Sequence, residues 1–327
     1  MNNRLYPLKF KPVYKDKIWG GSKIRDQLKL DFSPLSNCGE AWILSGVEGN
    51  QTLVENGFLA GNELNELVEV YMDDLVGGKV YQKFQNQFPV LVKIIDANDW
   101  LSIQVHPDDE LAAMRHNGSG KTEMWYVMGA DQGAELISGF NQAIDRDRYV
   151  KSLREKQLKS IMNFEPVSKG DVFYMPSGRV HALGPGIMLA EIQQTSDLTY
   201  RIYDWERVDD KGNSRELHTA LALDAIDFEF YDEYRTIYDE KLNATVPLVE
   251  SKYFTTRIIQ FNEPVNKDIS GLDSFIIYLC TEGKAMLHFR DGTIDINPGE
   301  TILIPAELPE IMFIPEKETI LLEVFID

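Results

Sequence analysis

The sequence predicts a mainly β protein built as two jelly-roll β-barrels with helical insertions. Short runs rich in β-branched and aromatic residues recur along the chain, and Gly, Pro, Asn or Asp separates them. After about residue 245 this alternation of strand and turn is almost unbroken. A faint repeat adds to the pattern, because Gly170 and Pro176 recur at an offset of 129 as Gly299 and Pro305.

Three segments carry apolar residues at a helical period and are predicted to be helices: residues 62–84, divided at Gly77 and Gly78, residues 149–162 and residues 215–228. The predicted strands of the first part of the chain are residues 90–95, 101–106, 124–128, 172–175, 187–193 and 200–205. Those of the last part are residues 254–261, 275–280, 284–289, 301–304, 311–314 and 319–324.

The repeat divides the chain into two predicted domains. Residues 1–240 would form a metal-binding catalytic domain with an N-terminal extension and the helical insertions. Residues 241–327 would form a degenerate second copy without metal ligands. At the offset of 129, His181 becomes Glu310, so the second copy keeps the turn and loses the histidine.

Composition restricts the location and the partners of the protein. The chain has 327 residues, 43% hydrophobic and 26% charged, which suits one large core or two medium ones. Its two cysteines, Cys38 and Cys280, lie far apart and outside any CxxC pattern, which favours a reducing cytoplasm over a disulfide framework or a thiolate zinc site. No signal peptide and no membrane span are expected. A net charge of −19 repels nucleic acid and anionic lipid, so neither is a predicted partner.

Two separated stretches predict one metal site. Alternate strand residues point to one face, so Gln104 and His106 project together while Ile103 and Val105 face the other way. Glu123 opens a neighbouring predicted strand and could reach the same cavity. The spacing from Gly170 to His181 resembles the second sequence motif of the cupin barrel. Gln104, His106, Glu123 and His181 are therefore candidate ligands for zinc or another first-row divalent ion, with iron and manganese left open.

Several ordered motifs resemble type I mannose-6-phosphate isomerases, in particular the compact bacterial form. They extend from about residue 14 to 225 and comprise Trp19-Gly20-Gly21, Glu40-Ala41-Trp42, residues 89–97 leading into residues 101–108, Lys121 to Tyr126, Gln194 to Arg201, and Arg215 to His218 with Ala220 and Leu221. The sequence departs from the family at Leu198, where asparagine is usual, and at residues 43–46. These departures leave the candidate metal ligands intact and affect the expected substrate specificity.

The resemblance implies roles for individual residues. It assigns Gln104, His106, Glu123 and His181 to one zinc ion per chain, and Arg201 and Lys121 to the active site. Lys93 and Ser102 match positions proposed to contact substrate, and Asp197 lies in the family's Ser-Asp segment. The implied reaction interconverts mannose 6-phosphate and fructose 6-phosphate through an enediol, with Lys121, Asp197 and a water on the metal as possible bases.

A phosphorylated substrate requires a local basic cluster in an acidic protein. Lys93, Lys121, Arg179 and Arg201 all fall in segments that would form the site, and they are predicted to supply that cluster. A zinc ion nearby should also lower the pKa of Lys121 and bring proton transfer within reach near neutral pH. The expected partner is thus a small sugar phosphate, bound by a cytoplasmic monomer or weak homo-oligomer.

Three other interpretations stay open. A paralogous isomerase would act on a different sugar phosphate. A cupin oxygenase normally uses iron and often three histidines, whereas Gln104 stands where the third histidine would be. A non-catalytic sugar-binding or regulatory cupin would bind metal and ligand without turnover.

Overall fold

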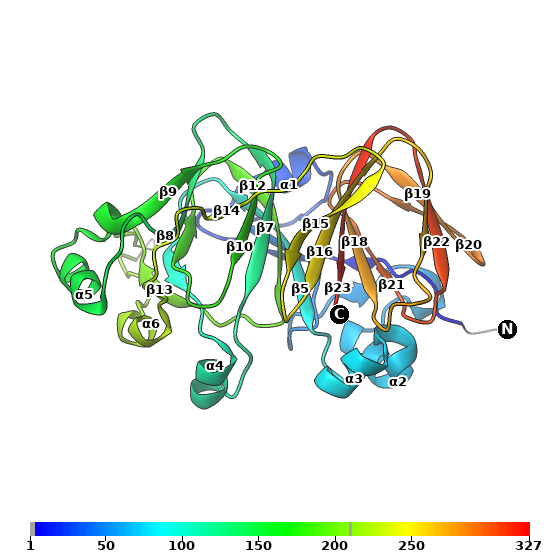
Figure 1. Ribbon diagram of the computed structural model, residues 1–327, viewed down its shortest axis with the longest axis horizontal. Helices are drawn as coiled ribbons and strands as arrows, with labels where there is room; N and C mark the ends of the chain where they lie inside the picture. Colours follow the sequence, from blue (N-terminus) through cyan, green and yellow to red (C-terminus); the bar gives the residue numbers. More distant parts are fainter. Residues whose placement is uncertain (1–3, 209–210) are drawn as a thin grey trace.

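The chain folds into two units, each with two facing β-sheets, and the alternation of side chains along the strands creates their interiors. The computed structural model describes residues 4–208 and 211–327, with the first two-sheet unit at the left of Figure 1 and the second at the right. The predicted mainly β architecture is confirmed. Among the described residues, no helix combines the length and apolar character that crossing a membrane requires.

The first unit contains a seven-stranded and a five-stranded sheet. The seven-stranded sheet has the order β14 (Arg235–Thr236), β10 (Val172–Met175), β7 (Glu123–Ala130), β12 (Ile187–Gln194), β5 (Val90–Ala97), β3 (Glu40–Leu44) and β2 (Val13–Lys15). The five-stranded sheet has the order β13 (Tyr200–Tyr203), β6 (Ile103–Val105), β11 (His181–Leu183), β8 (Glu135–Phe140) and β9 (Met162–Pro166).

The second unit repeats this plan with fewer strands. Its five-stranded sheet has the order β15 (Ala244–Glu250), β16 (Thr255–Phe261), β23 (Thr319–Phe325), β18 (Ile276–Glu282) and β21 (Thr301–Ile304). Its four-stranded sheet has the order β17 (Val265–Asp268), β22 (Glu310–Pro315), β19 (Ala285–Phe289) and β20 (Gly292–Ile296). A short pair, β1 (Phe10–Lys11) and β4 (Leu53–Val54), completes the set.

The repeat that the sequence predicts is present in three dimensions. Gly170 and Gly299 both adopt positive φ, 94° and 85°, a conformation that glycine reaches without strain. The amide of Gly170 donates to the carbonyl of Val127 at 2.8 Å, and the amide of Gly299 donates to the carbonyl of Cys280 at the same distance. Both glycines therefore start equivalent strands, β10 and β21, beside equivalent partners, β7 and β18.

The central strands are buried on both faces, and each face belongs to a different core. Along β5, Val92 and Ile94 pack in a large core shared between the two units, whereas Ile95 packs in the interior of the first unit. The same alternation in β7 and β12 sends Glu123 and Glu191 to that interior. Two carboxylates buried inside a small β unit need cationic partners or a metal ion.

The helices decorate this framework, and their bounds differ in part from the prediction. They are α1 (Lys23–Asp26), α2 (Leu64–Val76), α3 (Gly78–Phe84), α4 (Asp109–His116), α5 (Arg146–Arg154) and α6 (Thr219–Ala225), with short 3₁₀ turns η1 (Gly57–Leu59) and η2 (Leu158–Ile161). The predicted helix over residues 62–84 is confirmed, including its division, since Gly77 at φ 89° ends α2 and precedes α3.

Two predicted helices are too long. The helix predicted over residues 149–162 ends at Arg154, because Lys156 takes a positive φ of 57°, and Met162 already belongs to β9. The helix predicted over residues 215–228 begins only at Thr219. The amide of His218 donates to the carbonyl of Arg201 at 2.7 Å, which holds the preceding residues extended beside β13.

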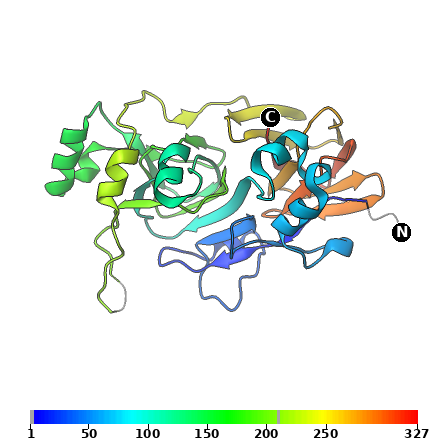
Figure 2. The same cartoon turned by 90° about the horizontal axis from the view of Figure 1, so that it is seen from below.

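Contacts across the predicted domain boundary join the two units. The boundary at residues 240 and 241 falls between β14 and β15, and the division into domains stays a prediction. Leu8 near the N-terminus pairs with Leu303 of β21, and the amide of Phe275 donates to the carbonyl of Val76 at 3.2 Å. Helices α2 and α3 thus lie against the second unit, as the lower right of Figure 1 shows. Figure 2 shows the same helices from below, beside the strands of that unit.

Candidate metal centre and cavity

Four residues predicted as metal ligands meet in the interior of the first unit. Gln104 of β6 is the direct cross-strand partner of His181 in β11, so these two side chains share one face of the five-stranded sheet. His106 follows β6 directly, and Glu123 begins β7 on the facing sheet. Ile103 and Val105 pack on the opposite side of β6, in an outer core beneath α5 and α6, as the strand period predicts.

His106, Glu123 and His181 form a compact buried cluster. Their ligand atoms all lie within 4.8 Å of one another. Glu123 Oε1 is 3.3 Å from His181 Nε2, and Glu123 Oε2 is 3.6 Å from His106 Nε2. The side-chain amide of Gln104 lies 3.2 Å from His181 Nε2. Two imidazoles, a carboxylate and an amide therefore converge on one point.

Backbone carbonyls fix the orientation of both imidazole rings. His106 Nδ1 lies 2.8 Å from the carbonyl of Leu198, and His181 Nδ1 lies 2.8 Å from the carbonyl of Arg179. A carbonyl only accepts, so each Nδ1 carries the proton and each Nε2 presents a lone pair to the cluster. Burial is the main cause that lowers the pKa of His181 to about 4 and the pKa of His106 well below its usual range, so both rings are neutral near pH 7.

The residues fit a metal ion. His106 Nε2 and both carboxylate oxygens of Glu123 are buried and have no hydrogen-bond partner in the described part of the chain, although Lys121 Nζ lies 3.1 Å from Glu123 Oε2 as an ion pair. Burial, followed by the charge of Glu191, raises the pKa of Glu123 to about 7 in the metal-free protein. Unpaired buried acceptors of this kind are what a divalent cation would satisfy.

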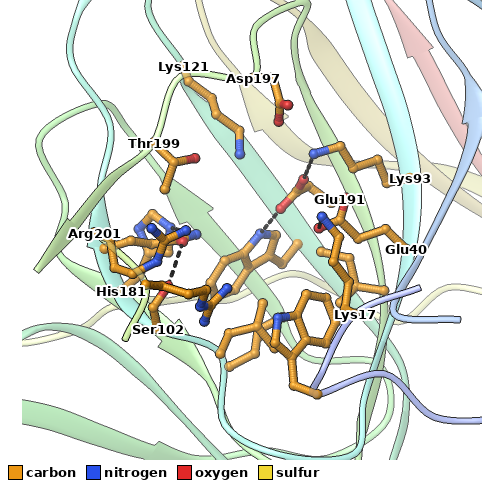
Figure 3. Close-up of a pocket in the computed structure, with 17 residues that line it drawn as sticks. Lys17, Glu40, Lys93, Ser102, Lys121, His181, Glu191, Asp197, Thr199 and Arg201 are labelled. Atoms are coloured by element: carbon orange, nitrogen blue, oxygen red, sulfur yellow. Dashed lines mark hydrogen bonds and ion pairs between the residues drawn. The ribbon is translucent and has the colours of Figure 1, made fainter. Parts of the chain in front are cut away.

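A cavity of about 280 Å³ opens beside the cluster. Gln104 and His181 form part of its wall, together with Ser102, Lys121, Asp197 and Arg201 (Figure 3). The lysine and arginine residues that line it are Lys17, Lys93, Lys121, Arg201 and Arg215. The acidic residues that line it are fewer: Glu40, Glu191 and Asp197. The cavity therefore provides the local basic cluster that an anionic ligand requires, despite the overall charge of −19.

An unpredicted ion pair occupies the wall opposite the histidines. Lys93 Nζ lies 3.1 Å from Glu191 Oε1, and the side chains of both residues are 4% exposed. The indole Nε1 of Trp125 donates to Glu191 Oε2 at 3.0 Å. Lys93 Nζ also lies over the ring of Trp42, 4.9 Å from its centroid. Glu191 was not among the predicted site residues, although a carboxylate directly after the apolar run from Ile187 to Ala190 was a local signal for it.

The second unit keeps a related arrangement without the histidines. Lys93 pairs with Glu191 across β5 and β12, and Arg257 pairs with Glu323 across β16 and β23. The hydroxyl of Tyr278 donates to Glu323 at 2.7 Å. It takes the place of the indole of Trp125, which donates to Glu191 at 3.0 Å. Within residues 4–208 and 211–327, the cluster that could hold a metal ion is the one in the first unit.

One expectation about a basic residue differs from the structure. The guanidinium of Arg179 lies over the rings of Tyr231 and Tyr234, 4.5 and 4.8 Å from their centroids, and not along the cavity. Arg179 instead contributes its backbone carbonyl to His181, so its side chain is left out of the proposed site. The lowering of the pKa of Lys121 by a nearby zinc ion stays a prediction, and the protein groups around Lys121 act in the opposite direction. Burial lowers this pKa, but Glu123, Glu191 and Asp197 outweigh burial and raise it above its ordinary value.

Arg201 and Arg215 reach the cavity from strand β13 and the segment after it. Arg201 pairs with Gln104 across β13 and β6, and its Nη1 donates to the carbonyl of Glu216 at 2.9 Å. Its Nε is buried and has no partner among the described residues, which leaves a donor for a ligand. Arg215 donates from Nε to Asp204 at 2.7 Å, so a buried carboxylate orients this second guanidinium.

The fold and the site together define the class: a double cupin enzyme whose first unit carries a buried cluster able to bind a metal. A model of the phosphomannose isomerase type I catalytic domain matches residues 7–131, and a model of the mannose-6-phosphate isomerase cupin domain matches residues 244–320. The chain belongs to the type I mannose-6-phosphate isomerase family, as its motifs predicted.

Individual relatives cover nearly the whole chain. The chain is 40% identical over 316 residues to the mannose-6-phosphate isomerase of Streptococcus mutans, covering 96% of this chain and 97% of that one. It is 35% identical over 308 residues to the mannose-6-phosphate isomerase ManA of Bacillus subtilis, covering 93% and 94%. The crystal structure of the mannose 6-phosphate isomerase from Bacillus subtilis matches with a TM-score of 0.87 at 31% identity, over 98% of this chain and 99% of that one.

Proposed function

We propose that the protein interconverts mannose 6-phosphate and fructose 6-phosphate, using one zinc ion held by Gln104, His106, Glu123 and His181. The observation that carries the proposal is a buried His-Glu-His cluster beside a cavity lined by five lysine and arginine side chains. When bound, the ion would act as a Lewis acid toward the negative charge that develops on O1 and O2 of an enediol. A cytoplasmic location, a monomeric or weakly oligomeric state and the absence of a nucleic-acid partner stay predictions.

The chain's own residues supply the rest of the chemistry. Lys121 places a positive charge beside Glu123, on the wall that faces the substrate. Asp197 on that wall can accept or return the proton moved between C2 and C1, and Lys121 could do so only where the bound ion lowers its pKa. Lys93 and Ser102 line the same space and can donate hydrogen bonds to sugar hydroxyl groups. Arg201 and Arg215 present guanidinium groups suited to the phosphate.

The reaction is tested by incubating the purified protein with mannose 6-phosphate and following the products by NMR. We expect fructose 6-phosphate at an equilibrium reached from either side. Other aldose phosphates are assayed in parallel as controls. Conversion of another aldose phosphate but not of mannose 6-phosphate would favour a paralogous isomerase. Metal and ligand binding without conversion of any sugar would favour a binding protein, and either result would overturn the proposal.

Arg201→Ala separates metal binding from substrate activation. Arg201 contacts the backbone of Glu216 and lines the cavity, but it is not among the candidate ligands. We expect turnover to fall about 100-fold, as for the loss of one preorganised donor at a charged centre, while the metal content stays unchanged. Steady-state kinetics and elemental analysis of the same sample check this. Loss of the metal from Arg201→Ala would contradict the division of roles.

A further inference from the structure

The segment from Gly120 to Glu123 carries two site residues on either side of Thr122. The amide of Thr122 donates to Gln194 Oε1 at 2.9 Å, and the amide of Gln194 donates back to the carbonyl of Thr122 at 3.1 Å. The amide of Gly120 donates to Asp109 Oδ1 at 3.0 Å. The positions of Lys121 and Glu123 therefore depend on Gln194 and Asp109, neither of which reaches the cluster.

Asp109 links this segment to the second unit. Its Oδ1 accepts from Gln194 Nε2 at 3.0 Å in addition to the amide of Gly120, and its Oδ2 accepts from the hydroxyl of Tyr253 at 2.7 Å. Burial raises the pKa of Asp109, but hydrogen bonds from Tyr253, Gln194 and Gly120 outweigh burial and lower it. A charged carboxylate that accepts three hydrogen bonds is a strong local anchor.

Tyr253 belongs to the turn between β15 and β16 of the second unit. The hydroxyl of Ser251 accepts from the amides of Tyr253 and Phe254 at 3.2 and 3.1 Å, so the turn is itself ordered. On the other side of the link, a Cβ on Gly120 would lie 2.5 Å from the backbone carbon of Asp108. Gly120 therefore lies directly against the backbone of Asp108 and Asp109, with no space for a side chain between them.

We propose that the second unit positions the metal-binding segment of the first unit through Tyr253. The hydroxyl of Tyr253 holds Asp109, Asp109 holds Gly120 and Gln194, and Gln194 holds the peptide between Lys121 and Glu123. The roles of Lys121 and Glu123 rest on the proposed function, whereas the link itself does not. Tyr253 is a positioning residue, and through it a unit without the metal-ligand cluster acts on the site of the other unit.

The test compares Tyr253→Phe with the matched control Tyr238→Phe. Tyr238, just before the domain boundary, also donates from its hydroxyl to a backbone carbonyl of the first unit, that of Gly170 at 2.8 Å, but at a strand start outside this link. We expect Tyr253→Phe to lower kcat about tenfold, because small misplacements of catalytic groups are costly, with KM changed less than about twofold. Tyr238→Phe should keep the wild-type kcat, and both variants should lose similar thermal stability.

Amide hydrogen exchange of the peptide covering residues 117–124 provides a readout that needs no activity. Tyr253→Phe should exchange faster in this peptide than the wild type, and Tyr238→Phe should not. An unchanged exchange rate in Tyr253→Phe would overturn the proposal, and so would faster exchange with an unchanged kcat or an equal loss of kcat in Tyr238→Phe. If the wild-type protein does not convert mannose 6-phosphate, the proposed function fails, and the exchange data alone decide whether the link exists.

Discussion

His181→Ala is expected to release the metal and to lower the turnover of mannose 6-phosphate by at least about 1000-fold. His181 is 1% exposed, its Nδ1 is held by the carbonyl of Arg179, and its Nε2 faces Glu123 and Gln104. Its removal leaves three of the four candidate metal ligands, and the buried carboxylate of Glu123 loses the imidazole beside it. Loss of a Lewis acid worth about 4 kcal/mol to the transition state corresponds to roughly three powers of ten in rate.

Glu310→Ala is the matched control for His181→Ala. Glu310 begins β22 at the position that the offset of 129 relates to His181, but it is exposed and belongs to the unit without the metal-ligand cluster. We expect wild-type metal content and turnover for this variant. Elemental analysis measures the metal content of both variants, and steady-state kinetics measures their turnover. Retention of a full complement of metal in His181→Ala would exclude His181 as a ligand.

Lys93→Met is expected to destabilise the protein by about 3 kcal/mol and to lower turnover by at least about tenfold. Removing one partner of a buried ion pair leaves the other charge uncompensated, which costs about 3–5 kcal/mol. The side chains of Lys93 and Glu191 are both 4% exposed, so solvent screens the pair little. Lys93, with Lys121, also holds the pKa of Glu191 at about 2 against the effect of burial. Urea unfolding measures the loss.

The double variant Lys93→Met/Glu191→Gln separates stability from activity. The neutral amide at position 191 could still accept from Trp125, so most of the stability should return while turnover stays low. Arg257→Met, at the equivalent pair in the second unit, should cost less, because Arg257 is 39% exposed and Lys267 also pairs with Glu323 at 2.8 Å. Wild-type turnover in the double variant would show that Lys93 does not act on substrate.

The residues that the sequence predicted to lie near the metal are on or beside strands. On a strand, side chains two residues apart point to the same face, so the sequence alone predicts where they point. Gln104 and His106 share a face because they are two apart, and Glu123 starts a strand that the sequence correctly located. Arg179 shows the limit of this reasoning. It follows Gly178, whose φ of 91° turns the chain, so its side-chain direction depends on contacts with Tyr231 and Tyr234 that no local pattern encodes.

Residues missed by the sequence analysis depend on packing between distant segments. Glu191 becomes part of the cavity wall only because β5, β7 and β12 pair in one register, which brings Lys93 and Trp125 beside it. The helix α4 was missed although Asp108 is a local signal, since its carboxylate accepts from the amide of Leu111 at 2.8 Å and caps the helix. The link from Tyr253 to Asp109 joins the two units and has no local sequence pattern.

Catalysis is proposed to depend on one metal ion held in the first unit. The most direct test strips the wild-type protein with a chelator, measures residual metal and activity on the same sample, and then titrates zinc back. We expect no activity after stripping and full recovery at one zinc ion per chain, with no recovery in His181→Ala. Turnover of mannose 6-phosphate that survives complete removal of the metal would show that the reaction does not need the ion.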